Sequence, residues 1–220
     1  MTIAGTSAKS HALFRDAGKH KGMFFATKPS ASRIQEFIEE QSKLPFSYRE
    51  VGQTRTGSPP AYPINHHREE LGSGEIFESA VTALHQWKMY DLGWTELCWT
   101  HLPVIEGTVT AVLANHYGFW SLNSCRVVYV LREESAPVIR EVFAVGTLPD
   151  HSEEGEERFS IVWNRENDTV SYDIYAFARP KHILARVAAP LARRVQHRFA
   201  RESAQAMLRA VNVNRERKTK

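Results

Sequence analysis

The stretch that most constrains the fold runs from Gly146 to Pro180. Two runs rich in β-forming residues, Glu157–Trp163 and Val170–Phe177, flank a short polar turn. Arg179 and Pro180 then open a long pattern of helical period. This order, strands first and one terminal helix last, predicts a curved antiparallel sheet that packs around a helix.

The same pattern extends upstream. Runs of β-branched and aromatic residues separated by short polar turns predict five or six strands between Trp94 and Phe177. We place them at Trp94–Thr100, Thr108–Leu113, Cys125–Leu131, Ile139–Val145, Arg158–Trp163 and Thr169–Phe177. The last helix is expected from about Lys181 to Val211, with a bend at Pro190 because proline removes a backbone donor.

The N-terminal third predicts two helices and short strands. Ser32 with Gln35 has the spacing of a capping box at the start of the first helix, and Ser73 is a candidate N-cap of the second. Short strands are expected at residues 23–26 and near Phe46–Val51. The rest of residues 46–71 is predicted to be loop, because Gly and Pro recur there.

Length and composition predict one domain. The 220 residues suffice for a single core, and we expect a flexible arm over residues 1–21, a domain over 22–211 and a charged tail over 212–220. No run of 18 apolar residues and no apolar leader is present, and the two cysteines lack CxxC spacing. These features favour a cytoplasmic protein, and leave open whether the arm is a targeting segment.

Charge is distributed unevenly along the chain. Residues 179–220 carry 12 Lys or Arg and 2 Glu, a net charge of +10, whereas residues 1–178 carry 16 Lys or Arg and 23 Asp or Glu, a net charge of −7. A basic end on an acidic body can contact phosphates, anionic lipid or an acidic partner. We favour a solvated helix face and expect no nucleic-acid partner, because no aromatic residues interleave with the arginines.

Several motifs resemble one known family. They are LGSGEIFESAVTALHQW (71–87), CRVVYV (125–130), GTLPDHSEEGEERF (146–159), AFARP (176–180) and the segment Gln196–Phe199. Together they resemble a bacterial and plant family catalogued as a domain of unknown function within the START and polyketide-cyclase superfamily. The chain departs from that family at Val142 and Val145, where a glycine and a tyrosine are usual. The resemblance implies an α+β helix-grip fold: a curved antiparallel sheet of six to seven strands around a long C-terminal helix, with two N-terminal helices.

The resemblance also implies an elongated apolar cavity between the sheet and the last helix. Such a cavity suits a lipid, a polyketide or an isoprenoid-like molecule. The alternative is that bulky aromatic side chains fill the space. Candidate ligand-binding residues are Thr147, Arg179, Tyr129, Phe143, Phe159, Trp163, Tyr172 and Trp120.

Polar residues among apolar neighbours are the candidates for chemistry. Strand alternation puts Glu157 on the face of Phe159 and Trp163, where desolvation raises the pKa of a carboxyl group. We therefore consider Glu157 and His151 as an acid and a base, with Arg126 or Arg179 holding an anionic group. The alternative, which we favour at this stage, is that Glu157 and an arginine form a structural ion pair.

Three functions remain open. The first is a binding protein for a hydrophobic small molecule, and the second is a cyclase, isomerase or hydrolase that acts on such a molecule through Glu157. The third is a protein that docks on a membrane surface or a partner through its basic last helix. We expect no cofactor and no metal site, since the histidines lack ligand spacing. A monomer and a homodimer are both compatible with the sequence.

Overall fold

The computed structural model describes residues 24–60, 62–98, 102–116, 118–181 and 189–218. They form an eight-stranded antiparallel sheet in the order β2-β8-β7-β6-β5-β4-β3, with β1 paired to the start of β5. The elements are β1 (Phe24–Phe25), α1 (Ala31–Ser42), the 3₁₀ helix η1 (Gln53–Arg55), β2 (Ile64–Ser73), η2 (Gly74–Ile76), α2 (Phe77–His85), η3 (Lys88–Tyr90), β3 (Thr95–Cys98), β4 (Val109–His116), β5 (Phe119–Ser135), β6 (Val138–Thr147), β7 (Glu153–Asn164), β8 (Thr169–Pro180) and α4 (Ala189–Lys218).

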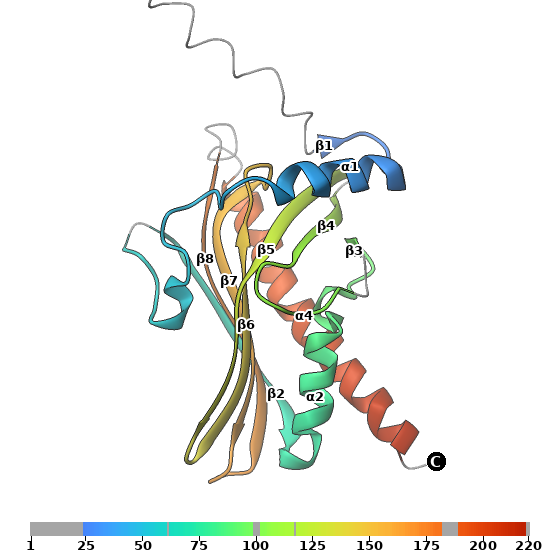
Figure 1. The fold of residues 1–220 in the computed structure, drawn as a ribbon. Helices are drawn as coiled ribbons and strands as arrows, with labels where there is room; N and C mark the ends of the chain where they lie inside the picture. The colour runs from blue at the N-terminus through green and yellow to red at the C-terminus, as the bar shows by residue number, and fades with distance from the viewer. Residues whose placement is uncertain (1–23, 61, 99–101, 117, 182–188, 219–220) are drawn as a thin grey trace, which may run out of the picture.

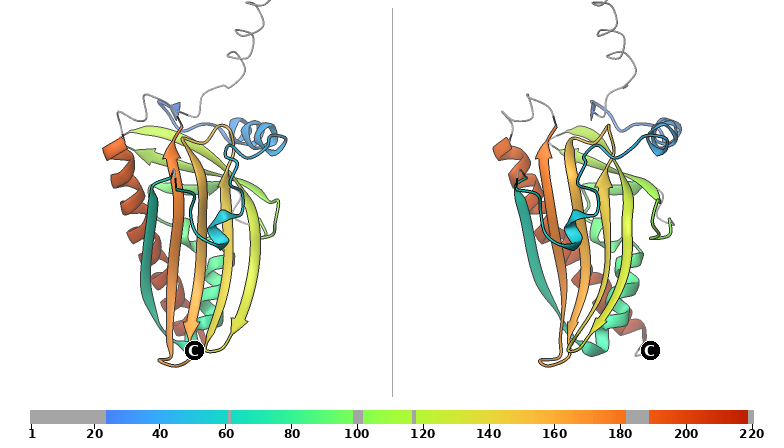
Figure 2. Two further views of the ribbon diagram at one scale, coloured as in Figure 1. Left: turned by 90° about the vertical axis from the view of Figure 1, so that its left-hand side faces the viewer. Right: turned by 60° about the vertical axis from the view of Figure 1, so that its left-hand side comes forward.

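The sheet is strongly curved, and α4 and α2 lie on its concave side (Figure 1). Residues 46–60, which we call the convex-face loop, cross the opposite side of the sheet (Figure 2). Helix α1 lies near one end, beside β4 and β5. The predicted α+β helix-grip architecture is therefore confirmed, with eight strands instead of the six or seven expected.

The core forms where inward-facing residues of neighbouring strands meet α2 and α4. Phe143, Phe159 and Ile174 occupy adjacent positions on β6, β7 and β8 and are fully buried. Small residues of α4 such as Ala204 let the helix approach the sheet closely, and the Ser203 hydroxyl hydrogen-bonds the Tyr172 hydroxyl at 2.7 Å. Burial of apolar surface between the two layers is the main stabilising contribution to this fold.

The hairpin between β7 and β8 also organises the start of α2. The predicted turn is present, and Asp168 adopts a positive φ of 53°, which Asp tolerates better than most residues. Its Oδ1 accepts hydrogen bonds from Gly74 N at 3.1 Å and Trp163 Nε1 at 3.0 Å. Ser73 holds the predicted N-cap position, at the start of η2, but its side chain makes no capping hydrogen bond.

Strand β2 was not expected, and the predicted strand at Phe46–Val51 is wrong. Residues 64–73 are polar and mostly part-exposed, and they become an edge strand because β8 supplies a partner along their full length. The segment at 46–51 instead belongs to the convex-face loop, where Ser47 N donates to Thr147 O at 3.0 Å. Neither outcome depends on local propensity, which is why the sequence pattern missed both.

The helix ends differ from the predictions in detail. Helix α1 is capped by Ser30, whose Oγ accepts from Arg33 N at 3.3 Å, and not by the expected Ser32. Helix α4 continues to Lys218, beyond the predicted Val211, and Pro190 is its second residue. The carbonyl group whose helical hydrogen bond Pro190 would remove belongs to residue 186, so the predicted bend at Pro190 stays a prediction. The expected helical residues 182–188 lie outside the described residues.

Candidate functional site

A cavity of about 630 Å³ lies between the concave face of the sheet and the N-terminal part of α4. Its walls come from nearly every element at this end of the molecule, and its apolar part includes Tyr90, Val112, Val145, Ala176 and Phe199. The rings of Tyr90 and Phe199 pack against each other with centroids 5.4 Å apart. The cavity has apolar walls and a few polar groups, which is the usual composition of a small-molecule site.

Glu157 is the polar group that stands out in this cavity. It pairs with Ala176 on β8 and Val145 on β6, and its side chain is part-buried among apolar neighbours. Among the residues that the structure describes, none makes a hydrogen bond or an ion pair with its carboxyl group. Burial, followed by the charge of Glu153, raises the pKa of Glu157 from 4.5 to about 8.

Glu153 and His151 lie beside Glu157 on the same wall. The carboxylate of Glu153 accepts a 2.7 Å hydrogen bond from Gln196 Nε2 on α4, and burial raises the pKa of Glu153. His151 Nδ1 lies 3.0 Å from Glu153 N and 3.1 Å from Glu153 O, so it accepts from the N–H in one tautomer and donates to the carbonyl oxygen in the other. Burial lowers the pKa of His151 to about 4, so the ring is neutral at pH 7.

Three of the candidate residues line the cavity: Glu157, His151 and Thr147. The Thr147 hydroxyl accepts from Gly155 N at 3.0 Å and hydrogen-bonds the Ser47 hydroxyl at 2.6 Å, which joins β6, β7 and the convex-face loop. The chemical roles of these three residues stay predictions.

Both candidate arginines lie elsewhere. Arg126 Nη2 donates to the carbonyl oxygens of Ser42 and Leu44, each at 2.9 Å. Arg179 Nε donates to Glu154 Oε1 at 2.5 Å, and its guanidinium lies 4.5 Å from the ring centroid of Tyr62. Neither guanidinium lines the cavity, and neither forms an ion pair with Glu157. The predicted anion-holding role and the predicted ion pair between Glu157 and an arginine stay predictions.

The aromatic candidates also lie outside the cavity lining. Trp120 packs near α1, and Tyr129 faces the convex side of the sheet. Phe143 and Phe159 lie in the core beneath Trp87 and Tyr90, Trp163 stacks near Phe77, and Tyr172 contacts Ser203. These six side chains pack against neighbouring elements, and their predicted role in ligand binding stays a prediction. The cavity walls come from other residues, including Phe24, Trp94 and residues of η3 and α4, which no strand pattern indicated.

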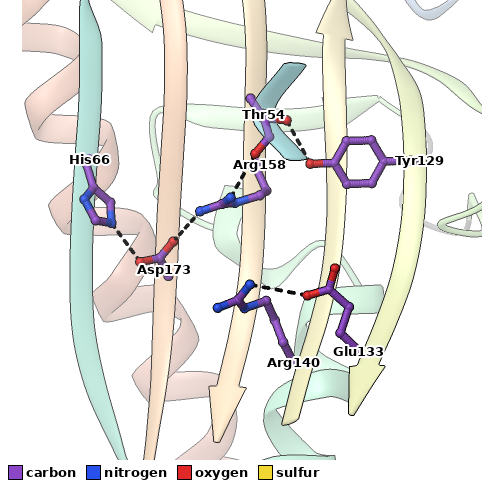
Figure 3. Close-up of polar contacts among 7 residues, drawn as sticks. All are labelled: Thr54, His66, Tyr129, Glu133, Arg140, Arg158 and Asp173. Carbon is purple, nitrogen blue, oxygen red and sulfur yellow. Dashed lines mark hydrogen bonds and ion pairs between the residues drawn. The ribbon is translucent and has the colours of Figure 1, made fainter. Parts of the chain in front are cut away.

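A second polar cluster lies on the convex face, where its members hydrogen-bond one another (Figure 3). Arg158 donates to Thr54 O at 2.9 Å and to Asp173 Oδ1 at 3.3 Å, and His66 Nε2 lies 2.8 Å from Asp173 Oδ2. Thr54 Oγ1 lies 2.8 Å from the Tyr129 hydroxyl. These contacts join the convex-face loop to β7 and β8, so we assign the cluster a structural role.

Neither a membrane-crossing helix nor a metal cluster emerges from the described ranges. None of their helices has the length and apolar character to cross a bilayer. Within the same ranges, no group of three or more His, Cys, Asp or Glu side chains could hold a metal ion. Cys98 and Cys125 are buried free thiols, as expected, and burial raises the pKa of both.

The curved antiparallel sheet, the long C-terminal helix and the cavity between them define a helix-grip protein of the α+β class. The chain belongs to the family described as "Domain of unknown function (DUF1990)", whose model matches residues 47–206. The predicted family resemblance is thus confirmed.

Three curated relatives are similar to this chain over almost the whole of their own length. A "UPF0548 protein" of Dictyostelium discoideum is 32% identical over 210 residues, which cover 87% of this chain and 97% of the relative. A "UPF0548 protein" of Arabidopsis thaliana is 29% identical, covering 85% of this chain and 97% of that protein. The corresponding protein of Deinococcus radiodurans is 30% identical, covering 86% and 98%.

Two solved structures are similar in fold at low sequence identity. Human STARD10 is 14% identical with a TM-score of 0.40, over 88% of this chain and 84% of that chain. Ara h 8.0201 is 11% identical with a TM-score of 0.40, over 69% of this chain and 99% of that chain.

Proposed function

We propose that this protein binds a hydrophobic small molecule in the cavity between the sheet and α4. The observation that carries the proposal is a hollow of about 630 Å³ in a molecule whose sheet and helices otherwise pack closely. That volume lies within the range of small-molecule sites, roughly 300–1,000 Å³. Apolar walls favour a guest that water solvates poorly, and the few polar groups on one wall can orient it.

Filling the cavity should abolish binding without unfolding the protein. Ala178 is part-buried on β8 and lines the cavity, so Ala178→Phe places an aromatic ring where the guest would lie. We expect the Kd for the fluorescent probe N-phenyl-1-naphthylamine to rise at least about tenfold, because the probe and the ring compete for one volume. Fluorescence titration measures the Kd, and thermal unfolding checks the fold.

Ala31→Phe is the matched control, since Ala31 is exposed at the start of α1 and lies outside the cavity lining. This variant should bind the probe as the wild type does. Equal binding by all three proteins, or no binding by the wild type, would contradict the proposal. Native mass spectrometry of the purified wild type should in addition detect a co-purified guest that Ala178→Phe lacks.

A second candidate function is acid–base catalysis on the bound guest. It is favoured by one specific observation, a carboxyl group without a hydrogen-bond partner among the described residues and with a pKa of about 8 inside the cavity. Such a group holds and releases a proton near neutral pH, as a general acid or base must. His151 is a neutral hydrogen-bonding group on the same wall.

The two functions predict different guests in a Glu157→Gln variant. If Glu157 only binds, mass spectrometry should find the same co-purified molecule in the wild type and in Glu157→Gln. If Glu157 is catalytic, the variant should accumulate an unconverted precursor that differs from the wild-type guest by the atoms of the reaction. Identical guests in both proteins would remove the catalytic candidate and leave the binding function in place.

Docking through the basic helix has less support. The described apolar side chains of α4 that face the sheet, including Ala204, Met207 and Val211, are buried against it. Arg198, on the exposed side, is already paired with Glu202 at 2.7 Å and lies 4.8 Å from the ring centroid of Trp94. Docking on a membrane would then depend on electrostatic attraction alone, and salt screens that attraction.

A further inference from the structure

Two carboxyl groups share one wall of the cavity. Glu153 and Glu157 occupy positions on β7 that face the same side, and only Gly155 lies between them on that side. The charge of Glu153 contributes to the raised pKa of Glu157, as expected for two carboxyl groups that line the same cavity. Carboxyl groups that are taken out of water need a positive or hydrogen-bond-donating partner.

Among the residues that the structure describes, such a partner is present for Glu153 and not for Glu157. Gln196 donates to Glu153, whereas no described residue donates to Glu157. The groups that act on or near Glu157 from other elements are Tyr90 on η3, Cys125 on β5 and Tyr172 on β8. All three are neutral at pH 7, because burial raises the pKa of each of them.

The basic side chains near the cavity lie away from these two carboxyl groups. Arg193 and His197 line it from α4, but both side chains are exposed to solvent. His151 is neutral, and the ammonium of Lys181 donates to Pro149 O. The described part of the cavity therefore has two carboxyl groups on its inner wall, apolar sides and positive charge only at its solvent-exposed rim.

This arrangement selects one class of guest. A carboxylate or phosphate group on the inner wall would meet two carboxyl groups, and a pure hydrocarbon would leave Glu157 without a partner. An alcohol would donate one hydrogen bond but bring no charge. We propose that the cavity binds a hydrophobic amine, with its cationic nitrogen against Glu157 and Glu153 and its apolar remainder between the sheet and α4. The proposal rests on the binding function proposed above and names the chemistry of the guest.

An ammonium group also changes the protonation of the site. In the empty protein Glu157 is mostly protonated at pH 7, because its pKa is about 8. A cation beside it favours the carboxylate, so binding at pH 7 should release about one proton from Glu157. At pH 9.5 Glu157 is already charged and the release should be close to zero. Glu153, whose pKa is also raised, can add to the release, while His151 stays neutral throughout this range.

The test uses three probes with the same ten-carbon chain: decylamine, 1-decanol and decanoate. Competition with N-phenyl-1-naphthylamine gives their Kd values, and calorimetry in two buffers of different ionisation enthalpy counts the protons released. We expect decylamine to bind at least about tenfold more tightly than 1-decanol, with decanoate the weakest. Glu157→Gln should bring the Kd of decylamine close to that of 1-decanol, remove the share of the proton release that comes from Glu157 and leave 1-decanol binding unchanged.

Glu154→Gln is the matched control. Glu154 follows Glu153 on β7, lies outside the cavity lining and forms an ion pair with Arg179. It should keep the preference for the amine. The proton count on the wild type needs no variant, so the proposal stays testable even if Glu157→Gln folds poorly. If 1-decanol or decanoate binds as tightly as decylamine, or if decylamine releases no proton at pH 7, the amine proposal fails while the binding function stands. If no probe binds at all, both fail.

Discussion

Replacing Glu156 by alanine should lower the free energy of unfolding by about 3–5 kcal/mol. Glu156 is 1% exposed, and its carboxylate accepts hydrogen bonds from Tyr48 Oη at 2.6 Å, Gly52 N at 2.6 Å, Thr54 N at 3.0 Å and the Thr54 hydroxyl. Burial and the nearby Glu156 raise the pKa of Tyr48, so its phenol remains a donor. Without the acceptor, these donors are left buried and the convex-face loop loses its attachment to β7.

Chemical denaturation measures the loss, and amide hydrogen exchange at Gly52 and Thr54 should become faster because the loop opens locally. Glu133→Ala is the control. Glu133 pairs with Arg140 at 3.3 Å on the exposed part of the sheet (Figure 3), with side chains 53% and 40% exposed. An exposed pair of this kind contributes about 0–1 kcal/mol. Similar losses in the two variants would show that Glu156 does not hold the loop.

The second large effect is the contribution of Glu157 to the dependence of stability on pH, to which Glu153 adds in the same sense because its pKa is also raised. Its pKa is about 8 in the folded protein against 4.5 as its ordinary value, so the folded state binds the proton more tightly. The stability that this proton provides is fully present below pH 4.5 and is lost as pH rises to about 8. Over this window the wild type should lose on the order of 4 kcal/mol through this group.

Glu157→Gln removes that dependence, because the amide resembles the protonated carboxyl group in shape and stays neutral. We expect the variant to match the wild type at pH 4.5 and to exceed its free energy of unfolding at pH 9, measured by urea denaturation across the range. His151, whose pKa is lowered to about 4, acts in the opposite sense below pH 6.5 but is present in both proteins and cancels in the difference. Parallel stability profiles would mean that Glu157 is ionised in the fold at neutral pH.

These two predictions concern neighbours in the sequence. Strand alternation places Glu156 and Glu157 on opposite faces of β7. One carboxyl group is surrounded by donors from the convex-face loop, and the other faces a cavity with no donor among the described residues. The same residue type therefore has a structural role on one side of the sheet and is a candidate for binding on the other.

The hydrophobic pattern predicted the sheet and the terminal helix because both depend on local periodicity. It placed Glu157 correctly on the face of Phe159, and the register confirms this. Simple alternation along β5 would also put Arg126, Val128 and Val130 on one face, but only Arg126 and Val128 lie on the side of Phe46. An irregularity between Val127 and Tyr129 shifts the register of β5, so Val127 and Val130 face the core while Val128 and Tyr129 face the convex side. Nothing in the local residue types marks such a bulge.

The sequence by itself determined the order of most strands, the amphipathic last helix, the family and the face on which Glu157 lies, since each of these follows from periodicity or from motifs within a short stretch. Only the tertiary structure decided that β2 is a strand, that the aromatic candidates pack against neighbouring elements, and which carboxyl group receives hydrogen bonds. These outcomes depend on contacts between residues about a hundred positions apart, such as Tyr48 with Glu156. A cavity is likewise the space that packing leaves between distant elements, so no local pattern can encode it.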